Sequence, residues 1–137
     1  MSTHATNLDL TSFQTRVYQW ALACFGFNHV TNIRERGCRF VEEALELGQI
    51  CSVSREDAHA LVEYVYDRPA GHVKQEIGGV QVTLACIAAV VGISMEDAGE
   101  QELARVLQPE VMAIVRAKQA QKAKAGFGGA LPGKVDP

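Results

Sequence analysis

The stretch IGGVQVTLACIAAVVGI, residues 77–93, is the longest apolar run of the chain and decides which fold class the sequence can adopt. Its β-branched cluster at 80–83 is compatible with a strand. The length of the run and its alanine-rich continuation instead predict a helix over about 72–91, ended by Gly92. That helix is apolar on almost all sides, which is typical of a helix packed against several neighbours. Glycines and polar residues interrupt the run, so it is too short for a membrane span, and we expect a buried helix.

Helical spacing dominates the rest of the chain as well. Ser54 and Ser94 are typical N-caps with acidic residues directly behind them, and Asp9 or Thr11 is expected to cap the first helix. Residues 27–32 are interpreted as a connector, and the Gly- and Pro-rich tail 126–137 as mobile. The sequence therefore predicts an all-α protein with one helical domain over 1–125. Helices are expected over about 10–25, 33–51, 55–67, 72–91, 95–107 and 109–124.

Composition excludes several function classes. The 137 residues are 47% hydrophobic and 21% charged with a net charge of −3, which is ordinary for one globular domain and gives no broad basic surface for nucleic acid. The four cysteines form no CxxC pair and are expected to be buried, reduced thiols. The first nine residues lack the apolar core of a signal peptide. We therefore expect a cytoplasmic protein without a nucleic-acid or membrane partner.

Two glutamates on the second predicted helix are candidates for metal binding. At about 100° per residue, Glu43 and Glu46 lie one turn apart on one stripe, so that both carboxylates can reach one cation. A solvated helix face is the more common explanation of such a segment, with nearby arginines simply pairing with the acids. Glu76 favours the metal interpretation, because it lies at the start of the most apolar helix. Burying its carboxylate there costs hydration free energy unless the carboxylate is paired or bound to a metal. A helix N-terminus, however, also favours an acid through the helix dipole.

The adjacent pair Gly78 and Gly79 needs a physical reason inside a helix. Each glycine costs roughly 1 kcal/mol relative to alanine. Either another helix approaches closely at this point, or the space is left for a ligand; the sequence leaves both open.

If the two helices pack together, Glu43, Glu46 and Glu76 form one acidic pocket. Three carboxylates repel one another unless a cation joins them, and hard oxygen ligands favour Mg²⁺, or Mn²⁺, over zinc. Magnesium also retains waters and shares the phosphate oxygens of a substrate, which suits an incomplete protein cage.

The ordered motifs resemble a known family. Glu42-Glu43-Ala44-Leu45-Glu46 is similar to the EExxE motif of the MazG-like, all-α nucleoside triphosphate pyrophosphohydrolases, and Glu76 is similar to the first acid of their ExxD motif. The resemblance covers about 13–107. It implies a MazG-like four-helix bundle core with an additional C-terminal helix, assembled as a homodimer or homotetramer. It also implies Mg²⁺ held by Glu43, Glu46 and Glu76, and cleavage of a nucleoside triphosphate between its α- and β-phosphates to a nucleoside monophosphate and pyrophosphate.

The chain departs from this family pattern at Gly79, where the family has an aspartate. A water, His72 or Asp97 is a conceivable substitute for the missing carboxylate, and a water is preferred here. The alternative is a catalytically weakened MazG-like module that binds nucleotides or serves helical assembly. A generic oligomeric helical scaffold is a third interpretation.

The expected chemistry is metal-assisted hydrolysis of a phosphoanhydride. The metal polarises the phosphates and lowers the pKa of the attacking water, which Glu43 or Glu46 orients as general base. Basic side chains are candidates for neutralising phosphate charge, and Trp20 for stacking on the base, although surface and core roles are more common for these residue types. The basic candidates are Arg36, Arg39 and Lys74.

Overall fold

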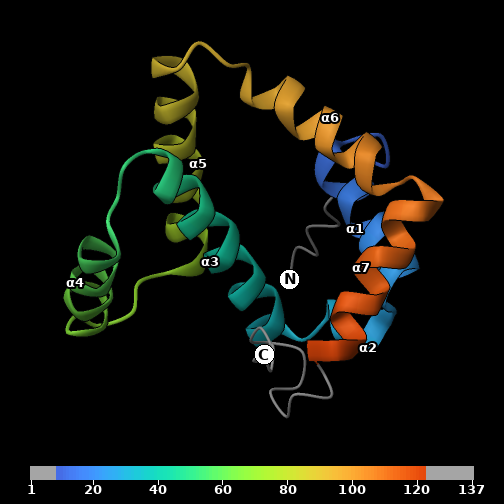
Figure 1. The fold of residues 1–137 in the computed structure, drawn as a ribbon, viewed down its shortest axis with the longest axis horizontal. Coiled ribbons are helices and arrows are strands. Elements are labelled where there is room, and N and C mark those ends of the chain that lie inside the picture. The colour runs from blue at the N-terminus through green and yellow to red at the C-terminus, as the bar shows by residue number, and fades with distance from the viewer. Residues whose placement is uncertain (1–8, 123–137) are drawn as a thin grey trace, which may run out of the picture. The chain divides into compact units, whose positions relative to one another are not determined.

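A computed structural model describes residues 9–122, and all regular structure in this range is helical (Figure 1). The prediction of an all-α chain is thus confirmed for these residues. Lys124 and the tail 126–137, which we expected to end the last helix and to be mobile, lie outside the described residues. The seven helices of the described residues are α1 (Phe13–Phe25), α2 (Phe27–Val30), α3 (Ile33–Ile50), α4 (Arg55–Tyr66), α5 (Val73–Val90), α6 (Met95–Val106) and α7 (Pro109–Lys122).

Local capping chemistry sets the helix boundaries. Ser54 and Asp57 form a reciprocal capping box at the start of α4, with both hydrogen bonds at 3.0 Å, as its sequence predicts. Ser94 accepts a hydrogen bond from the Asp97 backbone N–H at 3.1 Å at the start of α6. Gly92, at φ +70°, directly follows the last turn of α5, where a residue with a side chain is strained.

Two local predictions at the ends of α1 are wrong. The cap of α1 is Ser12, which accepts from the Thr15 backbone N–H at 3.2 Å, because the helix begins three residues later than expected. The side chain of Asp9 instead accepts hydrogen bonds from Thr11. The expected connector over 27–32 contains the short helix α2, which follows Gly26 at φ +80°.

The contacts divide the chain into two compact units. We call Met1–Arg39 with Glu100–Pro137 the terminal unit, and Phe40–Gly99 the middle unit. Helices α3 and α6 each contribute residues to both units. The expected single domain over 1–125 stays a prediction.

The terminal unit has a core built by α1, α6 and α7. Ala21, Cys24 and Leu103 are buried in it, and burial raises the pKa of the Cys24 thiol. The indole N–H of Trp20 donates to the Val106 carbonyl at 3.0 Å, which ties α1 to the end of α6. The Trp20 ring also meets the Phe25 ring edge to face, with centroids 5.5 Å apart.

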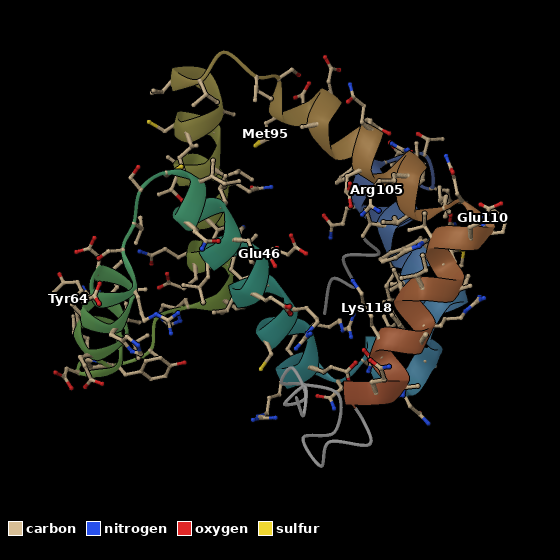
Figure 2. All side chains as sticks on the ribbon, viewed as in Figure 1. Glu46, Tyr64, Met95, Arg105, Glu110 and Lys118 are labelled. Atoms are coloured by element: carbon tan, nitrogen blue, oxygen red, sulfur yellow. The ribbon has the colours of Figure 1, made fainter. Side chains whose placement is uncertain are left out.

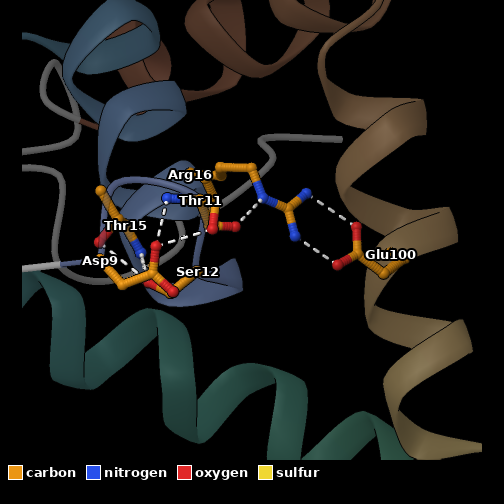
Figure 3. A network of polar contacts seen from close by, with 6 residues as sticks. All are labelled: Asp9, Thr11, Ser12, Thr15, Arg16 and Glu100. Carbon is orange, nitrogen blue, oxygen red and sulfur yellow. Dashed lines mark hydrogen bonds and ion pairs between the residues drawn. The ribbon is translucent and has the colours of Figure 1, made fainter.

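Hydrogen bonds and an ion pair outside the core also connect the helices of the terminal unit. The guanidinium of Arg116 on α7 donates to the carbonyls of Ala23 and Cys24 at 2.9 and 3.1 Å, where the last turn of α1 has free acceptors. Arg16 on α1 forms a two-pronged ion pair with Glu100 on α6 and also donates to the Thr11 carbonyl (Figure 3). The bonds of Arg116 to α1 and of Arg16 to Glu100 join segments that are more than 80 residues apart in sequence.

The middle unit has no such core, since none of residues 40–99 is buried. The expectation of a buried helix over 72–91 is therefore wrong for this chain by itself. The apolar residues Leu61, Val62 and Val65 on α4 are exposed as well. Apolar composition shows that a helix must be covered, but not that its own chain covers it. Cys51 and Cys86 are likewise exposed rather than buried, and all four cysteines are free.

Candidate functional site

The EExxE segment lies in the middle of α3, as the sequence predicts. Glu43 and Glu46 are one helical turn apart and are both exposed, whereas Glu42 is partly covered (Figure 2 labels Glu46). The positions of Glu43 and Glu46 on one helix place two carboxylates within reach of one cation. All three residues belong to the middle unit.

Glu76 lies in the first turn of α5 and is exposed. Its side chain bends back over Gly71 in the preceding loop, so closely that a Cβ at position 71 would overlap the carboxylate. Only glycine therefore fits at position 71 while Glu76 keeps this conformation. The first-turn position also favours a negative charge through the helix dipole.

The three carboxylates fit Mg²⁺ by their chemistry, since all are hard oxygen donors. Residues 9–122 nevertheless bring no three His, Cys, Asp or Glu side chains together as a metal group. The expected pocket of Glu43, Glu46 and Glu76 is thus not assembled by the described part of one chain. The structure supplies one pair on α3 and a third acid on α5 of the same unit.

The proposed substitutes for the missing aspartate have ordinary local roles. His72 is the N-cap residue of α5, is exposed, and makes no capping hydrogen bond through its side chain. Asp97 is exposed in the first turn of α6, behind the Ser94 cap. A Cβ built at Gly79 meets no atom within 4 Å, so an aspartate would fit sterically there.

The candidate phosphate- and base-binding residues lie in different places. Trp20 and Arg36 take part in the packing of the terminal unit, and the guanidinium of Arg36 lies 5.0 Å from the centre of the Phe25 ring. Arg39 is partly buried on α3, and Lys74 is exposed in the first turn of α5. Of the four, Lys74 lies nearest in sequence to a candidate metal ligand, Glu76.

A buried carboxylate that the sequence analysis missed lies in the first turn of α3. Glu35 is fully buried and is the hub of a polar cluster with His29, Arg36 and Gln119. Arg36 donates to one carboxylate oxygen at 2.6 Å, and the Gln119 side-chain amide donates to the same oxygen at 2.7 Å. Nδ1 of His29 lies 3.1 Å from the other oxygen.

This Glu35 cluster joins the C-terminal part of α7 to the start of α3. A buried carboxylate is tolerated only when charge and hydrogen bonds compensate for lost hydration, and here an arginine and an amide do so. Asn32 supports it by accepting the Glu35 backbone N–H at 3.1 Å. The sequence gives little indication of this contact, because Glu35 and Gln119 are 84 positions apart.

Comparisons with known proteins add no relative to this picture. No family model, no curated protein and no solved structure matches the chain.

Proposed function

We propose that the protein is a Mg²⁺-dependent nucleotide pyrophosphohydrolase that cleaves the α–β phosphoanhydride of a nucleoside triphosphate. The products are a nucleoside monophosphate and pyrophosphate. The observation that carries this proposal is the pair Glu43 and Glu46, exposed one turn apart on α3 in the same acidic unit as Glu76. The resemblance of these motifs to the MazG-like family supports the reaction type.

The charge of the middle unit supports a cationic partner. Residues 40–99 contain ten acidic and three basic residues, a net charge of −7, whereas the rest of the chain has six acidic and ten basic residues, a net charge of +4. Concentrated negative charge raises the local concentration of cations and repels a bare triphosphate. A divalent ion that binds both carboxylates and phosphate oxygens removes this repulsion.

In the proposed reaction Glu43, Glu46 and Glu76 hold the ion, and Glu43 or Glu46 takes the proton of the attacking water. The ion supplies charge neutralisation at the phosphates and a more acidic water. Lys74, two residues before Glu76 in the first turn of α5, is exposed and is the candidate cation for the leaving pyrophosphate. Mn²⁺ replaces Mg²⁺ in the same ligand set.

Phosphorus NMR of the protein with each nucleoside triphosphate and Mg²⁺ tests the reaction, because it separates pyrophosphate from inorganic phosphate. Glu43→Gln and Glu46→Gln are expected to lower the rate about 100-fold or more, since they remove the ligand charge. Glu63→Gln, an exposed acid on α4 of the same unit, is the matched control and keeps the rate. Absence of pyrophosphate from every triphosphate removes the enzyme proposal.

A second candidate function is a MazG-like module for nucleotide binding or helical assembly without catalysis. Two observations favour it: Gly79 in place of the family's aspartate, and the uncovered apolar side chains of the middle unit. Calorimetry separates the two functions. The enzyme binds a non-hydrolysable triphosphate only with Mg²⁺, whereas the module binds it equally without the ion or does not bind it at all.

A further inference from the structure

The loop between α4 and α5 contains a glycine, Gly71, that its own backbone does not require. Among the glycines of the described residues, Gly26 and Gly92 have a positive φ, and Gly71 does not. An alanine is therefore compatible with the backbone at position 71. The requirement for glycine comes instead from the side chain of Glu76.

The close contacts of a Cβ at position 71 are confined to one side chain. The three nearest atoms are Oε1, Cδ and Cγ of Glu76, and the third already lies at 3.6 Å, an ordinary van der Waals distance. The overlap therefore involves the outer end of Glu76, which is exposed and can rotate about its side-chain bonds. We expect a side chain at position 71 to displace this carboxylate and to leave the backbone around it in place.

The conformation of Glu76 follows from its place in the helix. Side chains of helical residues point toward the helix N-terminus, so residue 76 covers the loop ahead of the first turn. This end of α5 also has free N–H groups and the positive end of the helix dipole, which attract a carboxylate. The N-cap residue, His72, makes no side-chain hydrogen bond that would satisfy these groups. We call this arrangement, with the Glu76 carboxylate over Gly71, the folded-back conformation.

The folded-back carboxylate is not part of a three-ligand group. With Glu76 in this conformation, the described residues bring no three His, Cys, Asp or Glu side chains together. Glu43 and Glu46 lie on α3 of the same unit. A Glu76 carboxylate that binds the same ion as these two acids therefore has to leave Gly71. Metal binding and the folded-back conformation compete for one carboxylate.

We propose that Gly71 is a positioning residue for Glu76. Its missing side chain gives the carboxylate a resting place, which the carboxylate leaves when it binds a divalent cation together with Glu43 and Glu46. This inference rests on the proposed metal-binding role of Glu76 and identifies the residue that controls how available this ligand is. A carboxylate that is folded back for about four-fifths of the time lowers the apparent metal affinity about fivefold.

NMR of the full chain with ¹⁵N-labelled glycine tests the contact without any metal. The 12 glycines each contribute one amide signal, and the signal that is missing from Gly71→Ala identifies Gly71. Glu76→Ala is expected to shift this signal, because it removes the carboxylate from above the glycine. Gln75→Ala, at an exposed position of the same first turn, is the matched control and is expected to leave the signal nearly unchanged. Equal shifts in the two variants, or no shift in Glu76→Ala, overturn the proposal.

Addition of Mg²⁺ to the same samples tests the release of the carboxylate. As the ion binds, the Gly71 signal of the wild type is expected to move toward its position in Glu76→Ala, while the signal of that variant stays in place. Calorimetry measures the binding itself. Bound Mg²⁺ that leaves the Gly71 signal unmoved contradicts the release. A chain that shows the contact of Gly71 with Glu76 but binds no divalent ion refutes the proposed metal site, and with it the release.

A double-mutant cycle separates positioning from a general effect on the loop. Gly71→Ala removes the resting place and is expected to tighten Mg²⁺ binding about fivefold in calorimetry. In the Glu76→Ala background the same substitution is expected to have no effect, because the side chain that the Cβ overlaps is gone. Gly37→Ala on α3, where a Cβ meets no atom within 4 Å, is the glycine control and keeps the wild-type affinity. Weaker binding by Gly71→Ala, or an equal effect in both backgrounds, overturns the proposal.

Discussion

The terminal and middle units are similar in size but differ in what covers their apolar side chains. All five buried residues of the described chain belong to the terminal unit: Ala21, Cys24, Glu35, Leu103 and Gln119. The middle unit has 60 residues and none of them is buried. The same helical composition thus yields a closed core in one unit and uncovered helices in the other.

The difference follows from how far along the chain each unit finds its partners. In the terminal unit, α1 packs against α7, and hydrogen bonds connect residues more than 80 positions apart. Such long-range contacts close a core at the cost of chain entropy, which buried area and hydrogen bonds offset. In the middle unit, short loops connect α3, α4 and α5, and the apolar side chains remain exposed.

The largest effect is expected for Glu35→Ala in the terminal unit. The substitution leaves Arg36 and Gln119 without their buried acceptor, and removing one partner of a buried ion pair costs about 3–5 kcal/mol. The free energy of unfolding, measured by urea denaturation followed by Trp20 fluorescence, is expected to fall by that amount. Tryptophan is a clean reporter because Trp20 is the only one in the chain and lies in the terminal unit.

Glu35→Gln sharpens this prediction. Glutamine keeps the shape and one acceptor oxygen but loses the charge opposite Arg36, so it is expected to cost less than the alanine variant. If Glu35→Ala also abolished self-association at temperatures where Trp20 still reports a folded environment, the terminal unit would not be independent of the middle unit.

Hydrogen exchange gives the second largest contrast. Backbone amides of α1 and α7 are expected to exchange at a rate independent of protein concentration, because their core lies within one chain. Amides of α5 are expected to exchange about tenfold faster after dilution below the dissociation constant of the homo-oligomer that the MazG-like resemblance implies, since dilution would uncover them. Concentration-independent protection of α5 would show that a single chain suffices to protect this helix.

Most of the secondary structure could be predicted from the sequence because its signals are local. The Ser54 cap, the Gly92 stop and the turn-to-turn spacing of Glu43 and Glu46 all depend on residues within a few positions. The short helix α2 was missed, since a four-residue helix has too few residues for a periodic pattern. The Ser12 cap was missed because the expected start of α1 was three residues too early.

The long-range arrangement could not be predicted, and the candidate site shows why. Periodicity places Glu43 and Glu46 on one helix, but whether Glu76 joins them depends on packing that the residues of α5 do not specify alone. The same limit hid the contact between Glu35 and Gln119. Apolar periodicity also shows only that a helix face must be covered, and it does not show whether the same chain or another molecule covers it. For α5, the sequence therefore could not predict that the helix is exposed in the single chain.

Trp20→Phe is expected to have a moderate effect confined to the terminal unit. Phenylalanine keeps most of the ring contact with Phe25 but leaves the Val106 carbonyl without the indole N–H. A lost hydrogen bond of this kind costs about 1 kcal/mol, so the midpoint of thermal unfolding measured by circular dichroism should decrease by several degrees. Unchanged self-association of this variant is the accompanying control, because the middle unit is untouched.

The smallest effect on stability is expected when the pH is lowered. Each unit contains one carboxylate at which this effect can be measured. Hydrogen bonds from Ser54 lower the pKa of Asp57 in the middle unit, and the hydrogen bond from Arg16 lowers the pKa of Glu100 in the terminal unit. A lowered pKa in the folded state means that the charged form favours folding. The stabilisation is therefore complete above the pKa of a free carboxyl group, about 4, and is lost as the pH falls through the lower folded-state pKa.

The isosteric neutral variants Asp57→Asn and Glu100→Gln measure these contributions one unit at a time. Each should unfold at a slightly lower temperature than the wild type at about pH 6, and the gap should close as the pH falls through the lowered folded-state pKa, below which the wild-type acids are also neutral. Both carboxylates are exposed, so solvent screens the interactions and keeps the gaps small. If the Asp57→Asn gap persisted at low pH, the side chain of Asp57 would stabilise α4 through its shape and hydrogen bonds and not through its charge. The capping box would then be insensitive to acid, unlike the ion pair of Arg16 and Glu100.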